Sequence, residues 1–293
     1  MLERTDIMEK IKVNMLNDVF FKSLLCDDRH KELTLNFLNS ILNRTGDEAF
    51  YDIEFLDKEI DPIIEAGKVS ILDIRAKMND DTYVNVEVQI AKPVDMKKRA
   101  MFYWSKLYSY QIGKGEDYSL LKDVISINLL NFILFKEHKR CHSSCHITDD
   151  FDKNTVIKDF EMHFIELPKF KISDIKRLKK SEKWFALFSN RCTDEELEEI
   201  AMSEPSIKKA LEYQNYFMHD EKLRYKYELQ EKAIRDYNSS MRASKQEGIR
   251  EGIQSERKTI AINLLKANMS IDFISQNTGL SQQEILRLQQ SNL

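Results

Sequence analysis

Asp73 and Glu87 are acidic residues inside two stretches of sequence that otherwise have the composition of buried β-strands. Residues 68–78 and 83–91 are rich in aliphatic and β-branched side chains, and a short polar turn at residues 79–81 joins them. A charge in such surroundings costs free energy unless a partner balances it. The two segments therefore predict an antiparallel hairpin whose two carboxylates act together.

The length of the turn decides whether the two carboxylates meet. With a three-residue loop the hairpin is symmetric about Asp80, and Asp73 lies directly opposite Glu87 with Cβ atoms about 5 Å apart. A two-residue loop would shift the register by one residue and place Asp73 opposite a valine. Alternation along the second strand also puts Glu87 and Gln89 on one face, opposite a face of valines and an isoleucine.

Paired carboxylates at this spacing predict a site for a divalent cation, because two adjacent negative charges repel each other unless a cation joins them. Mg²⁺ binds one or two carboxylates together with waters and phosphate oxygens. The backbone carbonyl of Val88 would add a third protein ligand. Such an ion lowers the pKa of bound water and polarises a phosphoryl oxygen. From the pattern alone, a purely structural pair in a hairpin is the more frequent explanation.

The elements that would position this hairpin follow from hydrophobic periodicity. Apolar residues at three- and four-residue spacing predict helices within residues 14–43, divided by a turn at residues 26–28. The other expected elements are a strand at residues 51–60, an aromatic-rich helix at 95–113, a buried strand at 123–136 and a strand at 160–168. Alternating strands and helices predict an α/β core.

The second half of the chain, from residue 173, is helical and rich in charge. Residues 220–259 alternate charges with sparse apolar positions, which favours an exposed helical connector or an oligomerisation arm. Residues 260–290 predict a helix, a turn and a second helix. The second of these helices carries one basic residue, Arg287, so a role in packing or protein contact is favoured over DNA reading.

Composition limits the class of protein. The sequence contains no run of about 18 apolar residues and begins with a charged segment, so we expect a cytoplasmic protein without a membrane span. Four cysteines are too few for a disulfide scaffold. The net charge is −4, but residues 92–140 hold ten basic against five acidic residues, and residues 168–183 hold seven against two. These runs predict a basic groove on an acidic body, unless they are simply solvated.

Several segments, in order and spacing, give the sequence a specific resemblance. ILD (71–73) followed by EVQ (87–89) resembles the PD-(D/E)XK nuclease signature. Longer segments are similar to the recombination-promoting nuclease family, also described as transposases: NDVFFK (17–22), LDIRAKMNDDTYVNVEVQIA (72–91), KRAMFYWSKLYSYQI (98–112), HFIELPKF (163–170) and TGLSQQEI (278–285). The similarity runs over most of residues 14–290.

The resemblance implies a restriction-endonuclease-like α/β core at residues 1–172, a helical region and charged connector at 173–259, and a small helical unit at 260–293. It implies an endonuclease that hydrolyses double-stranded DNA with Mg²⁺ or Mn²⁺, linked to recombination, transposition or defence. Cutting both strands usually requires two active sites, which favours a homodimer through the C-terminal helical region. The alternatives are a DNA- or protein-binding module with an idle nuclease centre, and an oligomeric scaffold.

The resemblance also assigns site residues. It implies that Asp73 and Glu87 are the metal ligands and that Gln89 stands where the general signature has a lysine. A glutamine can orient water or phosphate but carries no charge, so a cation must come from elsewhere, with Arg75, Lys77 and Lys92 as the sequence candidates. Two further residues are expected at the site, Gln111 from the following helix and Asp18 from the N-terminal motif.

A dense group of cysteines and histidines, HKRCHSSCH, occupies residues 138–146. Such a composition invites a zinc-site interpretation. If the segment is extended, however, Cys141 and Cys145 lie about 13 Å apart, too far for one tetrahedral ion. A helical conformation would bring them together, but the segment follows a strand run and carries polar turn residues, so the zinc interpretation is the less favoured one.

Overall fold

The computed structural model describes residues 13–56, 74–172 and 174–291. Its strands form one six-stranded sheet in the order β1-β2-β3-β4-β6-β5. The strands are β1 (Ile53–Phe55), β2 (Ile74–Met78), β3 (Tyr83–Gln89), β4 (Val124–Leu130), β5 (His142–Thr148) and β6 (Thr155–Glu166). Strands β3, β4 and β6 run parallel, while β1, β2 and β5 pair with their neighbours in antiparallel fashion.

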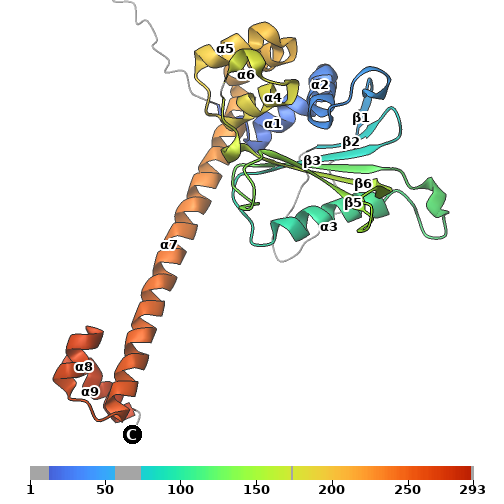
Figure 1. Cartoon of the computed structure of the whole chain (residues 1–293). Coiled ribbons are helices and arrows are strands. Elements are labelled where there is room, and N and C mark those ends of the chain that lie inside the picture. The colour runs from blue at the N-terminus through green and yellow to red at the C-terminus, as the bar shows by residue number, and fades with distance from the viewer. Residues whose placement is uncertain (1–12, 57–73, 173, 292–293) are drawn as a thin grey trace, which may run out of the picture. The chain divides into compact units, whose positions relative to one another are not determined.

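Helices cover both faces of this sheet. The helices are α1 (Asp18–Leu25), α2 (Lys31–Leu42), α3 (Met96–Ser109), α4 (Lys180–Ser189), α5 (Asp194–Ser203), α6 (Pro205–His219), α7 (Glu221–Lys266), α8 (Ile271–Thr278) and α9 (Gln282–Ser291). Helix α3 lies against one face, and α1, α2 and α4 lie against the other (Figure 1). The described residues contain no helix that is long and apolar enough to cross a membrane.

The hairpin of β2 and β3 has the register that the sequence predicted. Ile74 pairs with Val86 and Lys77 with Tyr83, and the backbone N–H of Met78 donates to the carbonyl of Thr82 at 2.8 Å. These pairs are symmetric about residue 80, and Asp81 in the turn has a positive φ of 67°. The predicted odd-length turn is confirmed. Asp73 lies outside the described residues.

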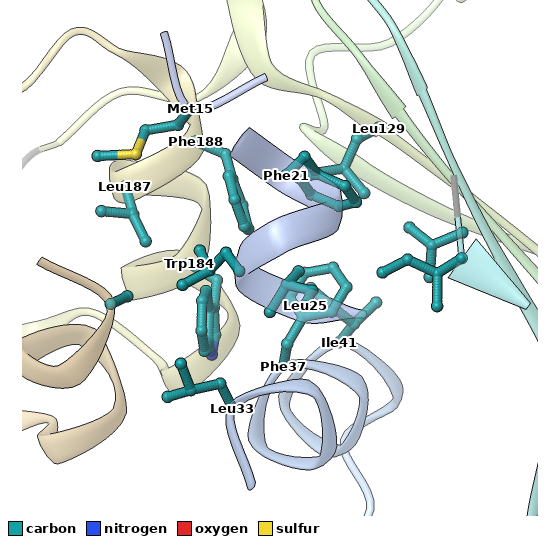
Figure 2. Packing of buried hydrophobic residues seen from close by; sticks show 14 of the residues in the cluster. Met15, Phe21, Leu25, Leu33, Phe37, Ile41, Leu129, Trp184, Leu187 and Phe188 are labelled. Carbon is teal, nitrogen blue, oxygen red and sulfur yellow. The ribbon is translucent and has the colours of Figure 1, made fainter. Parts of the chain in front are cut away.

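The main hydrophobic core fills the space between the sheet and helices α1, α2, α4 and α6 (Figure 2). The ring of Phe37 lies 5.5 Å from that of Trp184 and 5.7 Å from that of Phe188, both edge to face. The Trp184 indole N–H donates to Asn36 Oδ1 at 2.9 Å, so a large buried ring keeps its polar atom satisfied. This core fixes the helical layer on the sheet.

The described chain divides into two compact units, residues 1–230 and 231–293. Trp184, Phe217 and Tyr227 belong to the main core of the first unit. The domain boundaries expected from the sequence after residues 172 and 259 stay predictions.

The second unit contains the end of α7 together with α8 and α9. Its core consists of four buried residues: Ala261, Ile274, Leu280 and Ile285. Gly279 ends α8 in the left-handed conformation with φ 69°. Ser281 and Glu284 cap the start of α9 by reciprocal hydrogen bonds. The predicted turn and second helix are present at Gly279 and as α9, whereas the predicted first helix is divided into the end of α7 and α8.

Several predicted elements change length in the fold. The run predicted as a strand at 123–136 ends at Leu130, and residues 131–141 form a loop. The helix predicted at 95–113 ends at Ser109. Strand β5 was not predicted, because its sequence HSSCHIT is polar. It is an edge strand whose backbone pairs with β6, so its formation depends on a distant partner.

Candidate functional site

Glu87 is a buried carboxylate at the centre of the candidate site. It lies in β3 on the face covered by α3, with 1% of its surface exposed. Its Oε1 accepts hydrogen bonds from Arg99 Nε at 2.9 Å, Arg99 Nη2 at 2.6 Å and Gln89 Nε2 at 2.9 Å. The sequence prediction that Glu87 and Gln89 share one face is therefore confirmed in geometry.

Arg99 comes from the first turns of α3. Its guanidinium lies 4.9 Å above the ring of Tyr103, which is four residues further along the same helix. The guanidinium is thus placed between an aromatic ring of its own helix and the carboxylate of Glu87. A planar group with two N–H groups directed at one carboxylate is held more firmly than the flexible ammonium of a lysine.

The two oxygens of Glu87 have different surroundings. Burial raises the pKa of Glu87, and the charge and hydrogen bonds of Arg99, with the hydrogen bond from Gln89, act in the opposite direction. All the hydrogen bonds go to Oε1. Within the described part of the chain, Oε2 is buried and has no hydrogen-bond partner. A buried acceptor without a donor is costly, so this oxygen is available to a ligand.

A row of polar side chains continues across the sheet beneath α3. Asn85 pairs in register with Ser126, and Glu87 pairs with Asn128 on the parallel neighbour β4. All four are buried. Asn128 Nδ2 donates to the carbonyl of His163 at 3.1 Å. Its Oδ1 is buried and has no hydrogen-bond partner among the residues the structure describes.

These buried oxygens fit a hard divalent cation, which prefers carboxylate and amide oxygens. In the described ranges, no three His, Cys, Asp or Glu side chains form a group that could hold a metal ion. Among the described residues, an ion at this place would therefore be held by Glu87 Oε2 together with amide or backbone oxygens such as Asn128 Oδ1.

The site lies toward the carboxyl ends of the three parallel strands. Strands β3, β4 and β6 end at Gln89, Leu130 and Glu166, which are in register with one another. The backbone N–H of Asn131 donates to the carbonyl of Gln89 at 2.9 Å and begins the next loop. Open α/β sheets bind ligands at this edge, where the strands end and the loops converge.

Two of the cations that the sequence offered in place of the missing lysine have other partners. Lys77 forms an ion pair with Asp81 at 2.7 Å, and Lys92 donates to the carbonyl of Ile133 at 3.2 Å. Arg75 pairs in register with Asn85 on the hairpin. The cation that contacts Glu87 is Arg99, which sequence reasoning missed. The available signal was a basic run at the start of a helix that follows the hairpin.

Val88 lies between Glu87 and Gln89, and its side chain packs toward the main core on the opposite face of the sheet. Asp18 begins α1, and its carboxylate lies 2.7 Å from Lys22 Nζ one turn further along the same helix. Asp18 and the Val88 carbonyl therefore stay predictions as members of the site.

Gln111 is not brought to Glu87. It follows the C-cap of α3, and its side-chain amide donates to the carbonyl of Lys122 at 3.0 Å and accepts from the Lys122 N–H at 2.7 Å. Arg99 lies near the start of α3 and Gln111 lies beyond its C-cap, so most of the length of the helix separates the two residues. The expectation of a pocket glutamine assumed that the helix continued through residue 111.

Residues 142–146 of the cysteine- and histidine-rich segment lie in strand β5, and residues 138–141 belong to the loop before it. Cys141 packs against the main core, whereas Cys145 packs against the cluster under α3. On the main-core side, His142 Nε2 lies 2.8 Å from His163 Nδ1, and His163 Nε2 lies 2.7 Å from Glu161 Oε1. Burial and the adjacent His163 ring lower the pKa of His142 to about 4. The histidines thus form a hydrogen-bonded chain that ends at a carboxylate.

A mixed sheet with helices on both faces and a buried glutamate near the carboxyl ends of its parallel strands defines a restriction-endonuclease-like α/β protein. The family model for the PD-(D/E)XK nuclease family transposases matches residues 15–244, and the chain belongs to this family. The resemblance found in the sequence and the fold class it implied are confirmed. No curated protein and no solved structure gives a significant match.

Proposed function

We propose that the chain is an endonuclease that hydrolyses phosphodiester bonds of double-stranded DNA with Mg²⁺ or Mn²⁺. The observation that carries the proposal is Glu87, a buried carboxylate with one oxygen held by Arg99 and Gln89 and the other without a described partner. Family membership makes a nuclease the expected class of enzyme.

In this proposal, Asp73, Glu87 Oε2 and the carbonyl of Val88 hold the ion, and Asn128 Oδ1 is a further candidate ligand. The register of the hairpin supports the pairing, because position 73 directly precedes Ile74 in the sequence and Ile74 pairs with Val86. When bound, a divalent ion lowers the pKa of water and polarises a phosphoryl oxygen.

Neighbouring side chains position the carboxylate of Glu87 and balance its negative charge. Gln89 fixes the rotamer of Glu87 and presents an amide where the general signature has an ammonium group. The charge and hydrogen bonds of Arg99 favour the ionised form of Glu87 and oppose the burial that raises its pKa. Arg99 also supplies the positive charge that the missing lysine leaves unprovided. We propose that Asp18 acts from the rim of this site.

The proposal is tested by cleavage of supercoiled plasmid with Mg²⁺, Mn²⁺ or EDTA. Asp73→Asn and Glu87→Gln should abolish metal-dependent nicking, because each removes one anionic ligand with little change in volume. Glu54→Gln is the matched control, since Glu54 is an exposed acid on strand β1 of the same sheet. Calorimetric titration of Mn²⁺ gives a second readout that does not depend on turnover. Cleavage that persists in Glu87→Gln would refute the site.

A second candidate function is a DNA-binding module without nuclease activity. It is favoured by the ion pair itself, because Arg99 already neutralises Glu87 and no lysine stands at position 89. Duplex binding combined with no Mn²⁺ binding would support this second candidate over the endonuclease.

We further propose that two copies associate through α7, as cutting both strands requires. Three isoleucines on this helix, Ile249, Ile253 and Ile260, are 53%, 47% and 42% exposed, and their spacing places them on one face. Light scattering after size-exclusion chromatography should give twice the chain mass, and Ile253→Lys should give the monomer. A monomeric wild type would refute the dimer.

A further inference from the structure

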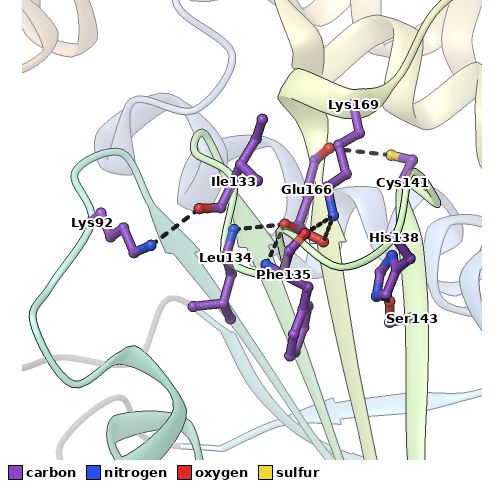
Figure 3. Close-up of polar contacts among 9 residues, drawn as sticks. All are labelled: Lys92, Ile133, Leu134, Phe135, His138, Cys141, Ser143, Glu166 and Lys169. Carbon is purple, nitrogen blue, oxygen red and sulfur yellow. Dashed lines mark hydrogen bonds and ion pairs between the residues drawn. The ribbon is translucent and has the colours of Figure 1, made fainter.

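Residues 131–141 form the loop between β4 and β5, and Figure 3 shows the polar contacts that hold this loop. Its first residue bonds to the end of β3, since the Asn131 N–H donates to the carbonyl of Gln89 at 2.9 Å. Lys92, just after β3, donates to the carbonyl of Ile133 at 3.2 Å. Lys97 of α3 lies 4.8 Å above the ring of Phe135. The loop is therefore contacted by the strand that carries Glu87 and by the helix that carries Arg99.

A buried ion pair fastens the middle of this loop. Glu166 is fully buried, and its Oε1 accepts from the backbone N–H groups of Leu134 at 2.6 Å and Phe135 at 2.9 Å. Lys169 Nζ donates to Glu166 Oε2 at 2.6 Å and to the carbonyl of Phe135 at 2.5 Å. Charged groups are costly to bury unless their hydrogen bonds are satisfied. Here those bonds fix the path of the loop backbone.

The end of the loop is also packed. The ring of His138 stacks on that of Phe135 with centroids 5.5 Å apart, and His138 Nε2 lies 3.3 Å from Ser143 Oγ of β5. With these contacts made, the side chains left at the surface of the loop tip are charged. Lys136, Lys139 and Arg140 are exposed.

The surface formed by residues 92–98 and 136–140 is strongly basic, which contrasts with the net charge of −4 for the whole chain. Its exposed charged residues comprise six bases and two acids: Lys92, Lys97, Lys98, Lys136, Lys139, Arg140, Asp95 and Glu137. The contact of Lys97 with the Phe135 ring makes the two segments continuous. We call this the basic loop surface.

We propose that the basic loop surface binds the phosphate backbone of duplex DNA next to the scissile bond. This inference rests on the proposed function and deepens it, because it names the side chains that hold the substrate. Duplex DNA is a dense line of negative charge, and each neutralised phosphate releases counterions. The fixed loop backbone limits the conformational entropy that DNA binding would cost. The surface contacts no base edges in this proposal, so it gives affinity without sequence preference.

The test measures binding rather than cleavage. Lys136→Gln, Lys139→Gln and Arg140→Gln are combined in one variant, which leaves every loop anchor intact. Fluorescence anisotropy with a short labelled duplex in EDTA is followed from about 50 to about 200 mM NaCl. The slope of log K against log salt is negative, and loss of three phosphate contacts should reduce its magnitude by about 2.7. Circular dichroism and the melting temperature should match the wild type.

The matched control removes the same charge from the other basic run of the sequence. Lys176→Gln, Lys179→Gln and Lys180→Gln change three exposed lysines near the start of α4. This control should keep the wild-type slope. An unchanged slope in the loop variant, an equal loss in the control, or a wild type that binds duplex RNA but not duplex DNA would each overturn the proposal.

The two proposals fail in different ways. If the wild type binds duplex DNA through the loop but shows no metal-dependent cleavage, the endonuclease proposal fails and the basic loop surface stands. If the wild type cleaves and the loop variant binds with unchanged affinity and slope, the endonuclease stands and the surface is overturned.

Discussion

Replacing Arg99 with glutamine should destabilise the protein by stranding the carboxylate of Glu87. In the described structure, Arg99 supplies two of the three hydrogen bonds to Glu87, and Gln89 supplies the third. Glu87 is 1% exposed, so water does not replace the lost donors. The variant keeps an amide in the helix but removes the charge.

The size of the effect follows from burial. Removing one member of a fully buried ion pair costs about 3 to 5 kcal/mol. The side chain of Arg99 is 30% exposed, and Gln89 keeps its hydrogen bond. We therefore expect a loss near the lower end, about 3 kcal/mol in the free energy of unfolding near neutral pH.

The cost of Arg99→Gln in the free energy of unfolding should also depend on pH. Burial already raises the pKa of Glu87, and without Arg99 its folded-state pKa rises further. A carboxyl group whose pKa is raised in the folded state destabilises the fold at pH values where it is ionised in the unfolded state. The cost disappears at low pH, where the group is protonated in both the folded and the unfolded state. The cost of Arg99→Gln should therefore be largest near neutral pH and should shrink as the pH falls toward the ordinary pKa of glutamate.

Urea denaturation in EDTA, near neutral pH and near about pH 5, measures both effects. The single variant Glu87→Gln and the double variant that combines it with Arg99→Gln complete a double-mutant cycle. The double variant should recover about 2 kcal/mol relative to the sum of the single variants, since a neutral glutamine at position 87 needs no cation. Additive costs, or a cost of Arg99→Gln that is the same at both pH values, would refute the reasoning.

Three further predictions concern stability away from Glu87. His142 has a folded-state pKa of about 4 against an ordinary 6.5, because it is buried as the neutral ring. The stability that depends on this neutral ring is fully present above the unfolded pKa and is lost as the pH falls toward the folded pKa. Urea unfolding should show a loss of about 2 kcal/mol between about pH 7 and about pH 5, and His142→Gln should remove that part; an equal pH dependence in the variant would contradict it. Gln111→Ala removes both side-chain bonds to Lys122 and should cost about 1 kcal/mol, with faster proteolysis confined to residues 110–122; unchanged proteolysis counts against this role. Ile274→Ala deletes part of a four-residue core and should cost the second unit about 3 kcal/mol. Amide hydrogen exchange should then accelerate in α8 and α9 alone, whereas acceleration across the sheet would contradict two independent units.

The hairpin could be predicted because its information is local. Alternation within β2 and β3 and the odd-length turn set which residues face each other, and both features are written in fewer than about 25 consecutive residues. The helix starts at Thr193 and Ser281 were predictable for the same reason, since a capping box spans four positions.

The strand boundaries were less predictable. The apolar run at 123–136 does not show where β4 ends, because Leu134 and Phe135 are as apolar as the strand but bond to Glu166. The polar strand β5 exists because β6 pairs with it. Pairing of this kind depends on a partner that is distant along the chain, so local composition does not indicate it.

The sequence alone therefore determined the family, the α/β class and the identity of Glu87 and Gln89 as side chains of one strand face. Only the tertiary structure decided that Arg99 is the cation at Glu87, that Asn128 lies beside it, and that Glu166 and Lys169 fix the adjoining loop. The physical reason is that a charge buried in one segment must find its partner wherever packing brings another segment, and the energy of that pairing belongs to the fold rather than to either segment.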